Sequence, residues 1–290
     1  MRALIVTADD VGLHAGMTAG ALKAHDEGIV TAVSVVPNGR AFEEAVDLLK
    51  DRPGLDVGIH FTLVGEHPLS RPERVRTLMD GHALLPDFRM FTRRYLLAGI
   101  APGEVEEELR RQVERLAATG LPIVHANSHQ HLHVLPKIFE TVLKIAEEYR
   151  IPFVRIPNEP ATFRRPSPRA LQIGILNGIG KTARRRLEDR LEEENGAVRA
   201  TDQTVGVLDA GGLNPAKLTQ ILDDVEGLAE LVCHPGLGDG DLAAAYDWGY
   251  GWDRETEALC DAGVREAARE KGIELTAFRQ ANIGSDILIS

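Results

Sequence analysis

The sequence predicts an α/β protein built as an irregular (β/α) TIM-like barrel, with parallel strands and helical insertions. Short β-branched runs alternate with longer helical patterns along the 290 residues, which is typical of a parallel sheet. Eight such runs occur, the number that a complete barrel needs. They are Ala3–Thr7, Ala32–Val36, Leu55–Ile59, Ile123–Ala126, Phe153–Ile156, Gln203–Val207, Glu230–Cys233 and Ile273–Ala277.

Three of the intervening segments carry helical patterns. Between Val105 and Leu116, apolar side chains recur on one helical face while charged side chains mostly occupy the other. Pro136–Arg150 begins with proline, which the first turn of a helix accommodates because that N–H has no partner within the helix. A third helix is expected over about Arg254–Lys271.

Two segments, 61–103 and 158–200, are too long to be simple connections between a strand and a helix. We expect both to be insertions that sit over one mouth of the barrel. The sequence shows no internal repeat or low-complexity tract. We therefore expect residues 1–290 to form a single domain.

The composition disfavours several classes of protein. A net charge of -11 and a pI near 5.4 argue against general nucleic-acid binding, which needs a basic surface. The two cysteines, Cys233 and Cys260, stand alone in their segments and indicate reduced thiols in the core rather than disulfides or a thiolate metal site. No signal peptide precedes Asp9, and no run reaches the ~20 apolar residues of a membrane span. We expect a cytoplasmic protein.

Side chains that can bind metal or transfer protons follow several predicted strands. The pair Asp9-Asp10 follows the first strand, and His60, His129 and His234 stand at or just past the ends of later ones. The carboxyl ends of barrel strands form the face where active sites assemble. Two adjacent carboxylates raise each other's pKa unless a cation or a hydrogen-bond donor compensates. The pattern therefore predicts a metal-dependent site at this mouth.

One carboxylate and two imidazoles leave coordination positions open for water and substrate, as catalytic metal sites require. We predict that Asp10, His60 and His129 bind one divalent metal ion. Asp9 could accept a proton from the metal-bound water, and His234 could protonate a leaving amine from the opposite side. The pair of imidazoles favours zinc.

Each of these features also has an ordinary structural explanation. An Asp-Asp pair often caps a helix or a turn, and His234 could cap the turn that follows it. The run His129–His133 places three imidazoles on one side if it is extended, or splits them if it turns. His131 and His133 are then donors that support the site, substrate contacts, or solvated loop residues. We expect His125 to pack in the core.

Five motifs, in order over most of the chain, resemble the YdjC-like (ChbG-type) carbohydrate deacetylases. The resemblance implies an irregular (β/α) barrel akin to polysaccharide deacetylases, a divalent metal, hydrolysis of an N-acetyl group from an amino sugar, and a homodimer. The motifs are Ala8-Asp9-Asp10-Val11-Gly12-Leu13, Gly28-Ile29-Val30-Thr31, Val57-Gly58-Ile59-His60-Phe61-Thr62-Leu63, Asn127-Ser128-His129-Gln130-His131 and Cys233-His234-Pro235-Gly236.

Carried over by motif, the resemblance implies that Asp10, His60 and His129 are the metal ligands and that Asp9 is the base. It permits magnesium beside zinc, with manganese and cobalt as further candidates.

Three further residues, Arg155, Asn127 and His131, are predicted to bind the substrate. Arg155 occupies the arginine position of the family after the fifth strand, and it either orients Asp9 or contacts substrate. The common family motif has aspartate where this chain has Asn127. This difference weakens an assignment to chitooligosaccharides and resembles the branch linked to hopanoid biosynthesis, which implies a lipid-linked N-acetylglucosaminyl group.

The segment from Phe163 to Arg190 is basic and apolar in an otherwise acidic protein. It could rest on an anionic membrane surface as a peripheral contact, or it could be a helical lid or a dimer contact with a solvated basic face. Gly178 and Gly180 are expected to interrupt a long helix here. The basic residues are Arg164, Arg165, Arg169, Lys181, Arg184, Arg185, Arg186 and Arg190.

Three aromatic residues, Trp248, Tyr250 and Trp252, lie in a glycine-rich stretch after the His234 strand. Their faces could stack on sugar rings, or they could cover the barrel rim or a subunit interface.

Two other functions remain open. A mononuclear iron oxygenase also uses two histidines and one carboxylate, although ligands on three ends of a parallel sheet argue against it. A non-catalytic, metal-containing carbohydrate- or lipid-binding barrel is the other alternative, and the retention of Asp9 disfavours it.

Overall fold

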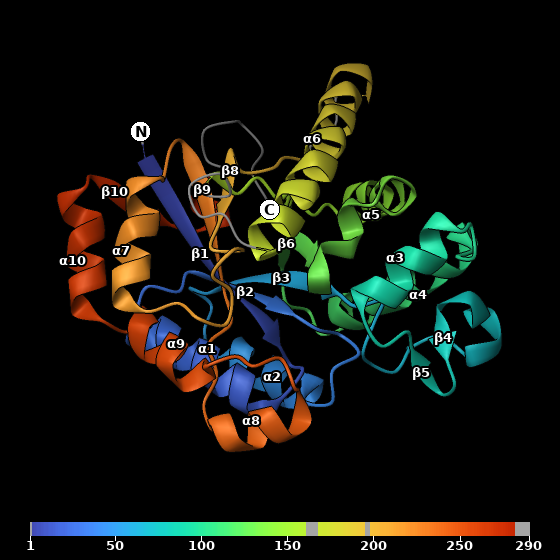
Figure 1. The fold of residues 1–290 in the computed structure, drawn as a ribbon, viewed down its shortest axis with the longest axis horizontal. Coiled ribbons are helices and arrows are strands. Elements are labelled where there is room, and N and C mark those ends of the chain that lie inside the picture. Colours follow the sequence, from blue (N-terminus) through green and yellow to red (C-terminus); the bar gives the residue numbers. More distant parts are fainter. Residues whose placement is uncertain (1, 161–167, 195–197, 282–290) are drawn as a thin grey trace.

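The computed structural model describes residues 2–160, 168–194 and 198–281 (Figure 1). Phe163, Arg164 and Arg165 of the basic segment lie outside these ranges. Seven strands are hydrogen-bonded in the order β7-β6-β3-β2-β1-β9-β8, and β10 pairs with the start of β1. The bounds are β1 Arg2–Val11, β2 Ala32–Val35, β3 Asp56–Phe61, β6 Ile123–Ser128, β7 Phe153–Val154, β8 Gln203–Val205, β9 Leu228–Cys233 and β10 Ile273–Thr276.

All ladders of this sheet are parallel, which confirms the eight predicted strands and the α/β class. The spatial order follows the chain order around a ring, so the sheet curls into a barrel. Between β7 and β8 the described residues form no ladder, and a single bridge joins Phe153 to Arg199. The hydroxyl of Thr204 also donates to the Ile156 carbonyl across this gap, at 3.0 Å. This seam makes the barrel irregular, as predicted.

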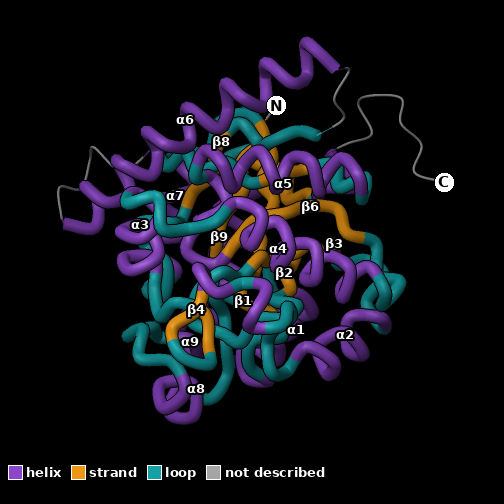
Figure 2. Tube along the Cα trace, turned by 90° about the vertical axis from the view of Figure 1, so that its right-hand side faces the viewer, coloured by secondary structure: helices purple, strands orange, loops and turns teal. Residues whose placement is uncertain are grey.

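The strands are almost continuously buried, because helices cover the outside of the sheet (Figure 2). The predicted helix around Val105–Leu116 is α4, and its four apolar stripe residues are all buried. The covering helices are α1 Ala15–Asp26, α2 Phe42–Lys50, α4 Pro102–Ala117, α5 Pro136–Glu148, α7 Pro215–Asp223, α9 Trp252–Leu259 and α10 Ala262–Glu270, with short α8 Asp239–Ala245 and α11 Phe278–Ala281.

The single helix predicted over Arg254–Lys271 is wrong, since the chain forms α9 and α10 there. Asp261 lies between them, and its carboxylate accepts hydrogen bonds from the N–H groups of Gly263 and Val264. This N-cap starts a new helix in place of continuing the old one.

Two segments depart from the strand and helix alternation. Residues 61–103 contain two short 3-10 helices, Pro72–Arg74 and Arg76–Leu78, the hairpin β4 Met79–Asp80 and β5 Ala83–Leu84, and helix α3 Phe88–Leu96. The second segment contains α6, Pro168–Glu194.

Helix α6 runs unbroken through Gly178 and Gly180, so the predicted interruption is wrong. A Cβ atom at Gly180 would lie 2.2 Å from the carbonyl oxygen of Pro157, whereas Gly178 faces open space. Gly180 therefore lets the helix approach the barrel closely. Within the described ranges no helix is long and apolar enough to cross a membrane. Cys233 and Cys260 are free, as predicted, although Cys260 is only half-buried.

Candidate active site

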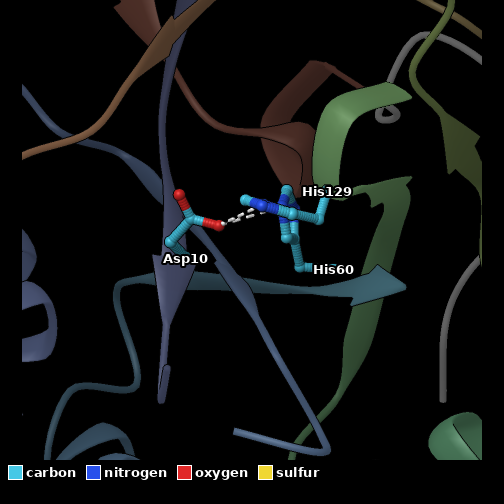
Figure 3. Close-up of side chains that lie close together, drawn as sticks. All are labelled: Asp10, His60 and His129. Atoms are coloured by element: carbon cyan, nitrogen blue, oxygen red, sulfur yellow. Dashed lines mark hydrogen bonds and ion pairs between the residues drawn. The ribbon is translucent and has the colours of Figure 1, made fainter. Parts of the chain in front are cut away.

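Three side chains converge at the carboxyl ends of β1, β3 and β6 (Figure 3). The Asp10 Oδ1 atom lies 3.2 Å from His60 Nε2 and 2.9 Å from His129 Nδ1. One ligand atom from each residue falls within 4.8 Å of the others. Two ligands on a tetrahedral zinc ion are about 3.3 Å apart, so the donor set fits a divalent metal. The three residues predicted as ligands thus lie together.

The backbone of β1 explains how two consecutive aspartates reach one site. Successive side chains of a regular strand point to opposite faces. Here the pairing register with β2 shifts between Ala8 and Val11, and Asp10 has a positive φ of 64°. Both Asp9 and Asp10 therefore line the same cavity. This strained conformation is one that aspartate adopts more readily than most residues.

Asn127 lies beneath the site and does not line the cavity, so its predicted contact with substrate is not supported. Its Oδ1 atom accepts a hydrogen bond from His60 Nδ1 at 2.6 Å, and its amide donates to Ser34 at 2.7 Å and to Asp9 at 3.3 Å. Because Nδ1 of His60 donates to Asn127, Nε2 is the ring atom that faces Asp10 and the candidate metal position. Asn127 thus selects the tautomer that can bind a metal.

Arg155 is also buried and does not line the cavity, and it contacts Asp9, as one of its two predicted roles requires. The guanidinium donates to both carboxylate oxygens of Asp9, at 2.5 and 2.9 Å. On its other side it donates to Glu230 Oε1 at 2.7 and 3.0 Å. All three side chains are buried. No role was predicted for Glu230, which lies within the apolar strand β9. Its charge within a hydrophobic run was the one signal that the sequence offered.

Both aspartates are held ionised. Burial opposes their charge, but Arg155 and then His60 keep the pKa of Asp9 well below its usual range. Burial likewise opposes the charge of Asp10, and the neighbouring His129 and His60 lower its pKa. Asp9 is therefore an unprotonated carboxylate beside the candidate metal ligands.

The His129–Val134 segment turns instead of extending, which separates its imidazoles. Gln130 and His131 both have φ of 55°, a left-handed conformation that is strained for residues other than glycine. His133 turns away from the site, and its ring bonds Ser128 Oγ at 2.7 Å and the Arg155 carbonyl at 2.8 Å.

His131 keeps a place in the cavity wall, and its buried Nδ1 atom has no hydrogen-bond partner among the described residues. Its predicted role as a substrate contact stays a prediction. His125 packs in the core as expected, with its ring stacked on Phe278.

His234 faces the same cavity from the end of β9, and its Nδ1 atom likewise has no partner in the described part of the chain. Burial lowers the pKa of His234, while the charges of Asp10 and Asp9 oppose this effect. Its backbone N–H donates to Glu255 Oε1 at 2.6 Å. Glu255, a fully buried residue of α9, gave no signal in the sequence.

The cavity has a volume of about 810 Å³ and opens between the strand ends and helices α3 and α6. Trp248 and Tyr250 belong to its wall, and their rings lie 5.1 Å from His129 and 5.3 Å from His234 respectively. Trp252 is buried and does not line the cavity, so it cannot stack on a bound sugar. Two of the three predicted aromatic residues are thus available to a ligand.

The fold is thus a parallel α/β barrel that groups one carboxylate and two imidazoles, a set able to hold a metal ion, at one mouth. The model of the YdjC-like protein family matches residues 3–270, and the chain belongs to this family. A carbohydrate deacetylase of Geobacillus stearothermophilus is 30% identical over 280 residues, covering 96% of this chain and 98% of that protein.

Two further comparisons agree with this placement. A carbohydrate deacetylase of Brevibacillus brevis is 44% identical over 154 residues, an alignment that covers 53% of this chain and 59% of that protein. The crystal structure of a candidate cellobiose-phosphate cleavage protein of Enterococcus faecalis V583 superposes with a TM-score of 0.74 at 25% identity. It covers 97% of this chain and 98% of that one.

Proposed function

We propose that the protein is a metal-dependent carbohydrate N-deacetylase, which hydrolyses the N-acetyl amide of an amino sugar to acetate and a free amine. The relatives named carbohydrate deacetylases support this activity. The observation that carries the proposal is the position of Asp9, an ionised carboxylate fixed by Arg155 next to three grouped metal-binding side chains. A site that only bound metal and sugar would not need this base.

A divalent ion held by Asp10, His60 and His129 would polarise the amide carbonyl and lower the pKa of its bound water. Asp9 accepts the proton of the attacking water, and Arg155 keeps the Asp9 carboxylate oriented and charged. His234 faces the same space and donates a proton to the leaving nitrogen. His131 contacts the sugar from the cavity wall. The imidazole pair favours zinc, and magnesium, manganese and cobalt remain compatible.

A second candidate substrate is an amino sugar linked to a lipid, because one wall of the cavity is apolar. Helix α6 contributes Ile173, Leu176 and Ile179, and the barrel contributes Val207 and Val232. Such a wall provides no hydrogen bonds for a second sugar, but it suits a hydrocarbon group. We also propose that residues 1–290 form one domain that acts in the cytoplasm as a homodimer, as the family resemblance implies.

Acetate release tests the proposed function. Soluble N-acetylglucosamine oligosaccharides and an N-acetylglucosaminyl lipid would be incubated with metal-loaded wild type, Asp9→Asn and His129→Ala. We expect acetate from wild type and a loss of at least about 100-fold in both variants. Bound metal should remain stoichiometric in Asp9→Asn and fall in His129→Ala. His82→Ala, an exposed histidine of the β4–β5 hairpin, is the matched control and should retain full activity.

No acetate from any substrate, with metal bound, would support the non-catalytic sugar-binding barrel. Oxygen uptake by the iron-loaded protein would instead support the oxygenase.

A further inference from the structure

The exposed large apolar side chains of the described residues are not scattered over the surface. All six lie on α3, immediately after it, or on α6: Phe88, Met90, Leu96, Leu97, Leu171 and Ile175. Four of them exceed 60% exposure, namely Leu96 at 75%, Leu97 at 73%, Leu171 at 70% and Ile175 at 61%. Single exposed apolar residues are normal on a protein surface, but a concentration on two helices indicates a contact surface.

The two helices border the same cavity. Phe88, Arg89 and Thr92 line it from α3, and Arg169, Ile175 and Leu176 are among the residues that line it from α6. Figure 2 shows α3 near the end of α6 at which that helix begins, in agreement with their shared cavity. Two of the six exposed apolar residues, Phe88 and Ile175, thus belong to the cavity wall, and the other four lie on or next to the same two helices.

Helical spacing carries this apolar surface outward from the cavity. Leu96 stands one turn after Thr92 on the same face of α3, and Leu171 stands one turn before Ile175 on α6. We call Phe88, Met90, Leu96, Leu97, Leu171 and Ile175 the mouth rim. The mouth rim is therefore a continuation of the cavity wall onto the protein surface.

The charge of α3 and of the first part of α6 is opposite to that of the whole chain, whereas residues 188–194 at the end of α6 are mostly acidic. Helix α3 carries Arg89, Arg93 and Arg94 and no acidic residue, although the net charge of the protein is -11. Residues 168–187 likewise contain no acidic residue, and their basic residues are Arg169, Lys181, Arg184, Arg185 and Arg186.

Several of these guanidinium groups donate hydrogen bonds to backbone carbonyls. A carbonyl carries no net charge, so these bonds do not neutralise the guanidinium groups. Arg94 binds the carbonyls of Thr77 and Met79, and Arg184 binds that of Thr201. Arg186 pairs with Glu140 at 3.6 Å. The mouth rim is thus apolar and lies on helices whose other basic side chains keep their charge.

We propose that α3 and α6 form a docking surface for an anionic phospholipid bilayer, with the mouth rim in the interface and the cavity facing the membrane. Apolar side chains flanked by lysine and arginine are the combination that binds such surfaces. A second copy of the chain fits less well, because a two-fold interface on this face would bring the two basic sets together and would cover the cavity entrance. Binding to a bilayer is a property beyond the proposed deacetylation, because it does not require that a substrate be hydrolysed.

Vesicle co-sedimentation tests this surface without any substrate. Vesicles of phosphatidylcholine alone, and of equal parts phosphatidylcholine and phosphatidylglycerol, would be mixed with wild type and three triple variants. The apolar variant is Leu96→Ser, Leu97→Ser, Leu171→Ser, and the charge variant is Arg93→Ser, Lys181→Ser, Arg185→Ser. The matched control removes three exposed basic residues from other helices: Lys50→Ser, Arg111→Ser, Arg269→Ser.

We expect wild type and the control to sediment with the anionic vesicles and not with phosphatidylcholine alone. The apolar variant should lose at least tenfold in vesicle affinity, and the charge variant about fivefold for each basic residue removed. None of the substituted residues lines the cavity, so acetate release from a soluble substrate should stay unchanged in every variant. That assay separates failure of docking from failure of the proposed deacetylase.

Two results would overturn the proposal. One is wild type that sediments no more with anionic vesicles than with neutral ones. The other is an oligomer, measured by light scattering, that dissociates in the apolar variant while vesicle binding is absent, which would assign the mouth rim to a second copy.

Discussion

Asn127 shows how one uncharged side chain controls a metal site without touching the metal. Its Oδ1 atom accepts the Nδ1 proton of His60 and so leaves Nε2 free to coordinate. We expect Asn127→Ala to lower zinc affinity by about 10- to 100-fold, because the imidazole loses its fixed tautomer and orientation. Isothermal titration of the metal-free protein with zinc measures this loss.

Asn127→Asp keeps an acceptor for His60 and should retain most of the zinc affinity. Asn158→Ala is the matched control, since its amide donates to the Asp202 carbonyl at 3.2 Å, outside the site, and should leave affinity unchanged. Equal affinity in Asn127→Ala and wild type would show that the tautomer of His60 does not depend on Asn127.

Glu255, which accepts a hydrogen bond from the His234 N–H, makes the stability of the fold depend on pH. Burial raises the pKa of its carboxyl to about 7, although N–H donors from His234, Leu213 and Gly211 act against this. A pKa raised on folding favours the protonated form in the folded state. Its contribution to stability is therefore complete below the unfolded value of 4.5 and is lost as pH rises through about 7.

The difference in unfolding free energy between wild type and Glu255→Gln should accordingly fall by about 3 kcal/mol between pH 4.5 and pH 8. Urea unfolding of both proteins across this range measures the difference. The hydrogen bonds that glutamine cannot make add a constant offset, so only the slope matters. A difference that does not change with pH would mean that Glu255 stays ionised throughout the range.

At the scale of elements, helix α1 meets the His234 loop through two glycines. A Cβ atom at Gly20 would lie 2.3 Å from the Cα atom of Gly236, which stands two residues after His234. We expect Gly20→Ala to destabilise the fold by about 1–3 kcal/mol and to lower kcat, because backbone cannot yield as a flexible side chain can. Thermal unfolding and acetate release give the two values.

Gly178→Ala is the control within another helix. Nothing lies within 4 Å of a Cβ atom at Gly178, so the substitution should stabilise α6 by up to about 1 kcal/mol. If Gly20→Ala proved as harmless as Gly178→Ala, the loop that carries His234 could not be packed as tightly as the structure shows.

Most strands were predictable from the sequence because a buried parallel strand must be apolar over several residues and flanked by helical patterns. The grouping of Asp10, His60 and His129 followed from the same logic, since parallel strands end at one edge of the sheet. The depth of each polar side chain below the cavity was not predictable from the sequence. Arg155 and Asn127 were predicted to contact substrate, but whether a polar residue at a strand end faces the cavity or lies beneath it depends on its partners from distant strands.

The elements that were mispredicted have local causes. The Asp261 cap divides a segment that reads as one helix, and the close approach of Gly180 to Pro157 keeps α6 continuous where glycine alone predicts a break. Glu230 and Glu255 were missed because a buried carboxylate looks like any charged residue in sequence. Only the tertiary structure shows that Arg155 and three backbone N–H groups surround them.

At the scale of the whole molecule, the candidate metal site connects parts of the chain that are far apart in sequence. Asp10, His60 and His129 close the ends of β1, β3 and β6, so an ion bound there would hold three strands of the barrel together. An ion that binds the folded chain and not the unfolded one stabilises it by about 2.7 kcal/mol at 100 times its dissociation constant. For a chain of 290 residues, this corresponds to a rise in Tm of about 4–5 °C.

We therefore expect zinc to raise the Tm of the chelator-treated wild type by this amount, as followed by differential scanning calorimetry. Asp9→Asn should keep the rise because Asp9 is not a predicted ligand, whereas His129→Ala should lose most of it. The pair separates coordination from catalysis, since both variants should be inactive. A rise of equal size in His129→Ala would place the stabilising ion elsewhere in the protein, and the role of the three strand ends as a metal site would then have to be abandoned.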